Sequence, residues 1–196
     1  MRDIQAGKRR ITKLTAIPLS RVFCLIEPGP VVLVTTADKG RANIMTMSWH
    51  MMMEFEPPLI GCVVSPANYS FAALRKTREC VIAIPAVDLI GKVVDIGNCS
   101  GKDVDKFETF RLTPMPAGEV KPPLIAECLA NLECRVVDTS RVGKYALFIL
   151  EVVKAWANPG RKQRRTVHAN GDGTFVVNGR TLNLKKKMVK WKGLLG

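Results

Sequence analysis

Residues 43–55, NIMTMSWHMMMEF, alternate short polar side chains with large apolar ones. At the period of a β-strand, one face carries Met45, Met47, Trp49 and Met51, and the other carries Thr46, Ser48 and His50. A strand face that only meets solvent usually carries long charged side chains, whereas short hydroxyls let a ligand approach the backbone. The pattern therefore favours a ligand-binding strand, and a half-buried strand with a solvent-facing polar side is the alternative.

A second group of polar residues lies in SPANYS, at an expected strand-to-helix junction. Its candidate binding residues are Ser65, Asn68, Tyr69 and Ser70. The unpaired N–H groups in the first turn of a helix attract anions, and hydroxyl or amide side chains can complete such a site. The segment predicts a phosphate-binding turn, with an ordinary N-cap as the alternative.

A third group lies in CSGKDVDKF, residues 99–107. Ser100 followed by Asp103 fits a capping box, which would explain both residues. Capping does not explain Lys106 and Phe107, a cation and an aromatic ring that could flank a phosphorylated ring compound. His168, which precedes a turn in TVHANGDGTF, is a candidate catalytic residue, with a structural or exposed role as the alternative.

The elements that must position these residues are mostly strands. We expect strands at 30–37, 41–51, 57–64, 80–86, 124–138 and 144–157, and a hairpin with an Asn-Gly turn at 173–184. Helices are expected after residue 65 and over 87–97, the second one ending at a glycine. Because short turns join most neighbouring strands, the pattern predicts a mainly β fold, an antiparallel barrel with a few helices.

Composition narrows the class of protein. The chain has 196 residues, of which 47% are hydrophobic, and no run is long enough to span a membrane. We therefore expect a single-domain, soluble cytoplasmic protein. Six cysteines without a C-x-x-C pair, several within apolar runs, indicate reduced buried thiols and no metal site. The Rossmann and P-loop motifs are absent from the sequence.

The net charge of +13 is located at the two ends of the chain. Residues 1–21 carry +5 and residues 158–196 carry +9, whereas residues 22–157 carry −1. A nucleic-acid-binding protein using its basic termini is one hypothesis, since Trp191 lies among lysines and could stack on a base. The nearly neutral central region makes nucleic acid an unlikely partner for the core.

Five segments together resemble the flavin reductase-like family, whose FMN-binding split barrel occurs in archaeal ferric reductases and flavoredoxins. In chain order they are PVVLVTTADKGRANIMTMSW, PPLIGCVVSPANYSFAAL, ECVIAIP, SGKDVDKF and PLIAECLANLECRVV. The resemblance implies an FMN-binding domain at 25–157, a basic N-terminal extension at 1–24, and a basic C-terminal segment at 158–196 that belongs to the same fold.

The resemblance also implies which residues hold FMN. The matching positions are Asn43, Met45, Thr46, Met47, Ser48 and Trp49 along the ring and ribityl chain, Ser65, Asn68, Tyr69 and Ser70 at the phosphate, and Ser100, Lys106 and Phe107 in the closing loop. On this interpretation the hydroxyl face meets the flavin and the methionine face packs into the barrel. His168 matches a family histidine near the nicotinamide, although its surroundings differ.

These implications define the expected function. Proteins of this family form homodimers that hold FMN near the subunit interface, and we expect the same assembly here. We also expect a flavoprotein oxidoreductase that takes hydride from NADH or NADPH. Its electrons would pass to free flavin, ferric complexes or a redox partner protein. FMN carries the redox chemistry itself, and the protein supplies orientation and electrostatics. A flavoredoxin-like electron carrier without nicotinamide activity is the alternative.

Overall fold

The computed structural model describes residues 14–22 and 29–184. The strands are β1 (Thr15–Ile17), β2 (Val32–Asp38), β3 (Arg41–Met47), β4 (His50–Phe55), β5 (Pro58–Val63), β6 (Glu79–Ile84), β7 (Pro114–Met115), β8 (Leu124–Ile125), β9 (Ala130–Asp138), β10 (Leu147–Ala157), β11 (Val167–Ala169) and β12 (Phe175–Val177). The helices are α2 (Tyr69–Thr77), α3 (Ile90–Gly97), α4 (Lys106–Thr109) and α5 (Val142–Tyr145), with short 3-10 turns η1 (Leu19–Arg21) and η2 (Val87–Leu89).

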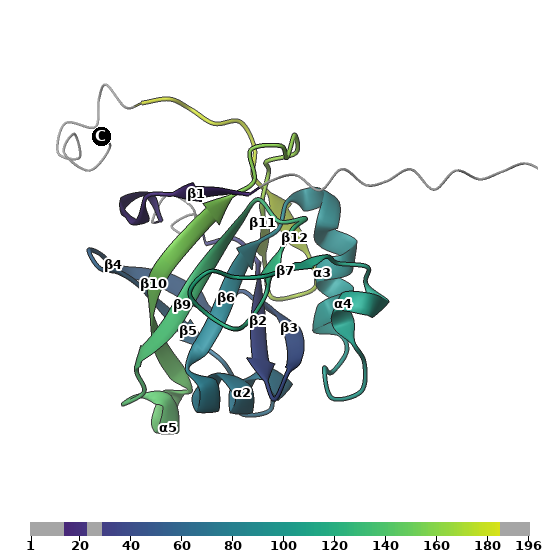
Figure 1. Ribbon diagram of the computed structural model, residues 1–196. Coiled ribbons are helices and arrows are strands. Elements are labelled where there is room, and N and C mark those ends of the chain that lie inside the picture. Colours follow the sequence, from purple (N-terminus) through teal and green to yellow (C-terminus); the bar gives the residue numbers. More distant parts are fainter. Residues whose placement is uncertain (1–13, 23–28, 185–196) are drawn as a thin grey trace, which may run out of the picture.

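One antiparallel sheet forms the body of the molecule. Its strand order is β3-β2-β6-β9-β10-β5-β4, and β1 also pairs with β10. The two strands at the ends of this order, β3 and β4, follow each other in the chain with only Ser48 and Trp49 between them. The sheet must therefore curl until its two edges approach, and Figure 1 shows the resulting barrel. This confirms the predicted mainly β, antiparallel barrel with a few helices.

A tight turn sets the register of the β2–β3 hairpin. Lys39 and Gly40 both adopt positive φ angles, 51° and 77°. Two such residues are what a type I′ turn needs, and its twist matches that of the flanking strands. The turn pairs Val32 with Met47 at one end and Asp38 with Arg41 at the other.

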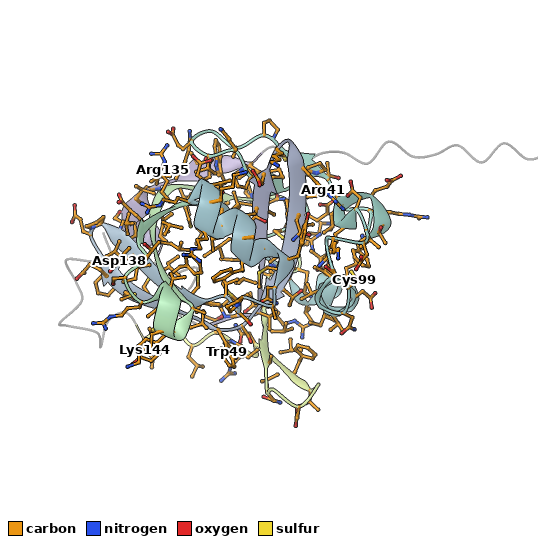
Figure 2. The ribbon with its side chains drawn as sticks, turned by 90° about the horizontal axis from the view of Figure 1, so that it is seen from below. Arg41, Trp49, Cys99, Arg135, Asp138 and Lys144 are labelled. Atoms are coloured by element: carbon orange, nitrogen blue, oxygen red, sulfur yellow. The ribbon has the colours of Figure 1, made fainter. Side chains whose placement is uncertain are left out.

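Alternation along β2 divides the core into two parts. Val32 and Val34 contact the cluster inside the barrel, whereas Leu33 belongs to a second cluster with residues of α3. Helix α2 lies across one mouth of the barrel, as the view from below in Figure 2 shows. Its Phe71 ring meets the Phe148 ring edge-on at 5.6 Å between centroids. The helices are thus held by apolar burial on both sides of the sheet.

The structure corrects the prediction of one continuous strand through the methionine-rich segment. Chain direction changes at Ser48–Trp49, where β3 ends and β4 begins at the opposite edge of the sheet. Met47 packs inside the barrel, but Trp49 and Met51 are 71% and 55% exposed. The expectation that the whole methionine face packs into the barrel is therefore wrong, because residues of the same parity face different surroundings beyond the crossing.

Three local predictions also differ from the structure. The C-terminal hairpin pairs β11 with β12 through a turn at 170–174, instead of turning at the Asn-Gly of residues 178–179. The predicted strand at 144–157 begins only at Leu147, because α5 precedes it. The predicted capping box is absent, since Asp105 caps α4 by accepting the Phe107 and Glu108 N–H groups.

Both chain ends of the described region attach to the barrel. Near the N-terminal end, β1 pairs with β10, and Val22 is buried in the barrel core. On the C-terminal side, Val31 N–H donates to the Val167 carbonyl at 2.8 Å, and Val167 is 2% exposed. The lysine-rich tail lies outside the described residues, as does most of the predicted N-terminal extension. No helix within residues 14–22 and 29–184 is long and apolar enough to cross a membrane.

The described cysteines are all free thiols. Cys62, Cys80, Cys128 and Cys134 are buried, as their apolar surroundings predicted, whereas Cys99 is half-buried. Burial raises the pKa values of the Cys62 and Cys128 thiols. No group of three or more His, Cys, Asp or Glu residues within the described ranges is placed to hold a metal ion.

Candidate functional site

Two adjoining clefts run along the outer edge of β3. The first has a volume of about 190 Å³ and is lined by Asn43, Met45, Thr46, Ala67, Asn68, Tyr69, Ser70, Ile96, Gly97, Asn98, Cys99, Ser100, Gly101 and Lys106. The second, of about 260 Å³, is lined by Met45, Thr46, Met47, Ser48, Trp49, Val63, Ser65 and Asn68. The clefts share three residues, so together they form one groove, which we call the β3 groove.

The groove gathers twelve of the thirteen residues that the sequence assigned to cofactor binding. They come from β3 and its connection to β4, from the loop before α2 and the start of that helix, and from the α3–α4 loop with the first residue of α4, which are distant in the chain. Phe107 is the exception, because its ring is 8% exposed and packs in the cluster beneath α3. Phe107 therefore does not line the groove, and its ring supports the groove from behind; its contact with the ligand stays a prediction.

The floor of the groove is an open strand edge. Strand β3 ends the sheet order, and no other described strand pairs with its outer side. In such a strand, every second residue directs its backbone N–H and C=O away from the sheet. The groove therefore offers alternating donors and acceptors, which suit the polar edge of a planar heterocycle.

One end of the groove is suited to an anion. The nine-residue helix α2 begins there, and its N-cap Asn68 makes no side-chain capping bond to the described chain. Backbone N–H groups in the first helical turn carry partial positive charge. Lys106 faces the same end, is only 4% exposed, and donates from Nζ to the Ile96 carbonyl at 2.8 Å. An ammonium group has three N–H donors, so two more can serve a bound anion.

Burial affects the charge of Lys106. Loss of solvent lowers the pKa of the ammonium group, and the nearby Cys99 thiol opposes this by raising it. A bound anion would favour the protonated form, because an opposite charge stabilises the ammonium group. Lys106 is thus a buried cation, and a bound phosphate would stabilise its charge.

A close backbone approach shapes the middle of the groove. Asn43 is 6% exposed, and its Nδ2 donates to the Ser70 Oγ at 2.9 Å. Its Oδ1 is buried and has no hydrogen-bond partner among the described residues. A Cβ added to Gly101 would lie 1.9 Å from that oxygen, so only glycine fits against it. The groove thus contains an acceptor that a ligand hydroxyl could satisfy.

The three side chains of the hydroxyl face lie in different surroundings. Thr46 Oγ1 donates to the Val93 carbonyl of α3 at 2.6 Å, which fixes that helix against β3. Ser48 is exposed in the second cleft. His50 lies beyond the crossing and bonds the Pro30 carbonyl through Nε2 at 2.7 Å. The Ser48 hydroxyl is therefore free to donate, whereas the Thr46 hydroxyl has used its one proton and can still accept a hydrogen bond from a ligand.

His168 does not line either cleft. It is half-buried on β11 and lies near His50. Burial lowers the pKa of His50, the bond to Pro30 raises it, and the possible charge of His168 lowers it further. A catalytic role for His168 stays a prediction.

The sequence did not predict that Arg41, Cys99 and Gly101 belong to the site. Arg41 donates from Nη2 to the Gly101 carbonyl at 2.7 Å, which ties the hairpin turn to the loop that closes the groove. Figure 2 shows Arg41 and Cys99 on the same side of the barrel. The Ser-Gly pair in CSGKD was a signal for a close backbone approach, but its partner Asn43 could not be identified from spacing.

Comparisons with known proteins agree with this geometry. Residues 26–175 match the family described as "Flavin reductase like domain". The protein YddH of Escherichia coli is 33% identical over 184 residues, covering 87% of this chain and 97% of the relative. The reductase component of a 4-nitrophenol monooxygenase from Rhodococcus opacus is 31% identical over 66% of each chain.

Solved structures show the same fold. An FMN-binding domain of a flavin reductase-like enzyme from Shewanella baltica superposes with a TM-score of 0.82 at 24% identity, covering 88% of this chain and 97% of that one. Flavoredoxin from Methanosarcina acetivorans superposes with a TM-score of 0.69 at 27% identity, covering 84% and 91%.

The chain belongs to the flavin reductase-like family and has its split-barrel fold. This confirms the resemblance found in the sequence. Nothing in the family match or in the described residues supports the nucleic-acid hypothesis.

Proposed function

We propose that the protein binds one FMN per chain in the β3 groove and acts as an oxidoreductase. The observation that carries the proposal is the groove itself, an open strand edge that leads to a helix N-terminus and a buried lysine. An FMN molecule has matching parts in the same order, a planar ring with a polar edge, a hydroxylated chain and a phosphate. The relatives described as FMN-binding or as reductases support the same conclusion.

The residues present suit each part of FMN. Lys106 and the first turn of α2 would hold the phosphate, since both present N–H donors to the same end of the groove. Asn43 Oδ1 would accept a bond from a ribityl hydroxyl. The backbone edge from Met45 to Trp49 would bond the ring, and Ser48 and Ser65 would add hydroxyls there. When bound, FMN supplies the redox chemistry by accepting and releasing electrons.

We further propose that NADH or NADPH is the electron donor, and that free flavin or a ferric complex is the acceptor. A basic run, Arg161, Lys162, Arg164 and Arg165, precedes β11 and could attract the donor's phosphates. Arg161 already pairs with Asp88, so the other three supply most of that attraction. Exposed charges act weakly and are screened by salt, so a preference for NADPH should be modest.

Two linked measurements test this function. The purified protein is expected to bind FMN at one per chain in an absorbance titration. Anaerobic mixing of the FMN-loaded protein with NADH or NADPH is then expected to bleach the flavin absorbance. A protein that titrates no FMN under native conditions would contradict the whole proposal. Dithionite serves as the control reductant.

An electron carrier is the second candidate function. The likeness to a flavoredoxin of 27% identity favours it, and it requires the same groove. If dithionite bleaches the bound flavin while neither nicotinamide does, the carrier reduced by a partner protein is the better description. His168→Ala separates the cases further, because it should slow bleaching only where that imidazole orients a nicotinamide.

We also propose that two copies form a homodimer through the β4 side of the barrel. β4 is an edge strand on which Met51 and Met53 are 55% and 43% exposed, and Trp49, just before it, is 71% exposed. Such a row of large apolar side chains on an open edge favours association. Light scattering is expected to give twice the chain mass, and Met51→Lys is expected to shift the protein towards monomer. A monomeric wild-type protein at micromolar concentration contradicts this assembly.

A further inference from the structure

A separate pocket of about 480 Å³ lies between the β2–β3 hairpin and α2. Its lining residues are Thr36, Asp38, Lys39, Arg41, Asn43, Tyr69, Ala72 and Ala73. Asn43 and Tyr69 also line the β3 groove, so the pocket adjoins the end proposed for the phosphate. We call it the hairpin pocket. Its volume is within the range of about 300–1,000 Å³ that is typical of small-molecule sites.

The pocket contains an unused polar group at its base. Thr36 is 1% exposed, and its Oγ1 has no hydrogen-bond partner among the described residues. Thr36 is the direct cross-strand partner of Asn43, whose Oδ1 is also unpaired. Buried hydroxyl groups are normally hydrogen-bonded, so the unpaired Thr36 Oγ1 indicates that a polar molecule in the hairpin pocket completes it.

The charges around the pocket are mainly positive. Lys39 and Arg41 are exposed residues that line this pocket. The one carboxylate, Asp38, is paired with Lys76 at 2.8 Å, and that ammonium group lowers the pKa of Asp38. An anion entering the pocket therefore meets two cations and a carboxylate that is already neutralised.

One wall of the pocket is aromatic. The Tyr69 ring is 43% exposed, and the Arg41 guanidinium lies 5.9 Å from its centroid. Along α2, Ala72 and Ala73 follow Tyr69 at helical spacing. Their small side chains leave space over that face of the helix. A flat ring next to an arginine and a row of small residues can accommodate a stacked base.

We infer that the hairpin pocket binds a nucleoside monophosphate. Tyr69 stacks on the base, Thr36 bonds a polar group on the base or ribose, and Lys39 with Arg41 holds the phosphate. The nucleotide is either free or the distal half of a flavin dinucleotide whose flavin half occupies the β3 groove. The second source rests on the proposed FMN function, whereas the first does not.

Calorimetric titration with adenosine 5′-monophosphate tests the site directly. The titration is made on the protein with and without FMN, so that the result does not depend on flavin binding. Ala73→Leu fills the pocket without touching the β3 groove, and it is expected to weaken nucleotide binding at least tenfold. Thr36→Val is expected to weaken it several-fold, whereas Thr36→Ser keeps the hydroxyl and should bind like the wild type.

The outcomes separate the alternatives. Adenosine and inorganic phosphate, titrated separately, should each bind more weakly than the monophosphate if both halves of the pocket contribute. If FAD binds more tightly than FMN and Ala73→Leu removes only that difference, the ligand is a flavin dinucleotide. If the monophosphate binds alongside FMN and FAD shows no advantage, the ligand is a free nucleotide. Absence of nucleotide binding, or binding that Ala73→Leu leaves unchanged, overturns the inference and leaves ordered water as the partner of Thr36.

Discussion

Gly101→Ala is expected to weaken FMN binding by about tenfold to a hundredfold while the barrel stays folded. The new Cβ would lie 1.9 Å from the Asn43 Oδ1 and 2.4 Å from its Cγ. Asn43 is buried and anchored to Ser70, so it can move only by giving up that hydrogen bond. Leaving a buried polar group unpaired costs about 1–3 kcal/mol, and about 1.4 kcal/mol corresponds to tenfold in affinity.

A second glycine provides the matched control. Gly91 is the second residue of α3 and lines neither cleft of the groove, and an added Cβ there would meet nothing within 4 Å. Gly91→Ala should therefore leave FMN affinity unchanged and not destabilise the protein. Equal FMN affinities for Gly101→Ala and the wild type, measured by fluorescence titration, would show that this approach does not shape the flavin site.

Local patterns were enough to find the strand that forms the groove. The alternation in residues 41–47 and the junction before α2 both depend on neighbours in sequence, and both are present in the structure. The same alternation wrongly predicted that the strand continues after Met47. The crossing to the opposite sheet edge at that point results from barrel closure, which the alternation does not encode. Closure depends on the pairing of all seven strands in the path, which no short window of sequence contains.

Two candidate capping residues lie before α4, and their competition explains why the predicted capping box is absent from the structure. Ser100 and Asp105 are both good capping residues, and the sequence favoured Ser100 because Asp103 follows it at the required spacing. In the structure Ser100 Oγ instead accepts the Lys102 N–H within a turn, and Asp105 begins the helix. That choice brings Lys106 to the first helical turn, where its ammonium group reaches the Ile96 carbonyl.

The hairpin pocket could not be found from the sequence. Thr36 lies in PVVLVTTA, which indicates only a buried strand rich in β-branched residues. Its unpaired hydroxyl becomes evident only when α2 and the turn at Lys39 enclose it. Sites made from residues distant in the chain have no periodic signal, so they appear only once the tertiary structure is known.

Glu133→Leu is expected to lower the free energy of unfolding by about 1.5–3 kcal/mol or more, since a hydrogen bond to a charged group contributes about 1.5–3 kcal/mol and several are lost together. Glu133 is 0% exposed on β9, and its carboxylate accepts three backbone N–H groups and one indole N–H. The donors are Gly118 at 2.9 Å, Glu119 at 2.6 Å, Val120 at 3.1 Å and Trp156 Nε1 at 2.6 Å. Leucine has similar bulk but no acceptor, so all four donors would lose their partner, and the buried Val120 N–H would stay unpaired.

Urea unfolding measures the effect, and two further variants make it specific. Glu133→Gln keeps one acceptor oxygen and should lose less stability than the leucine variant, whereas Glu108→Gln, at an exposed position on α4, should stay within about 0.5 kcal/mol of the wild type. Glu133 lines neither the β3 groove nor the hairpin pocket, so the folded fraction of Glu133→Gln should retain wild-type FMN affinity. A leucine variant as stable as the wild type would mean that the segment at 118–120 does not depend on this carboxylate. Stability loss together with weaker FMN binding in the folded protein would instead show that the far side of the sheet helps to hold the groove in shape.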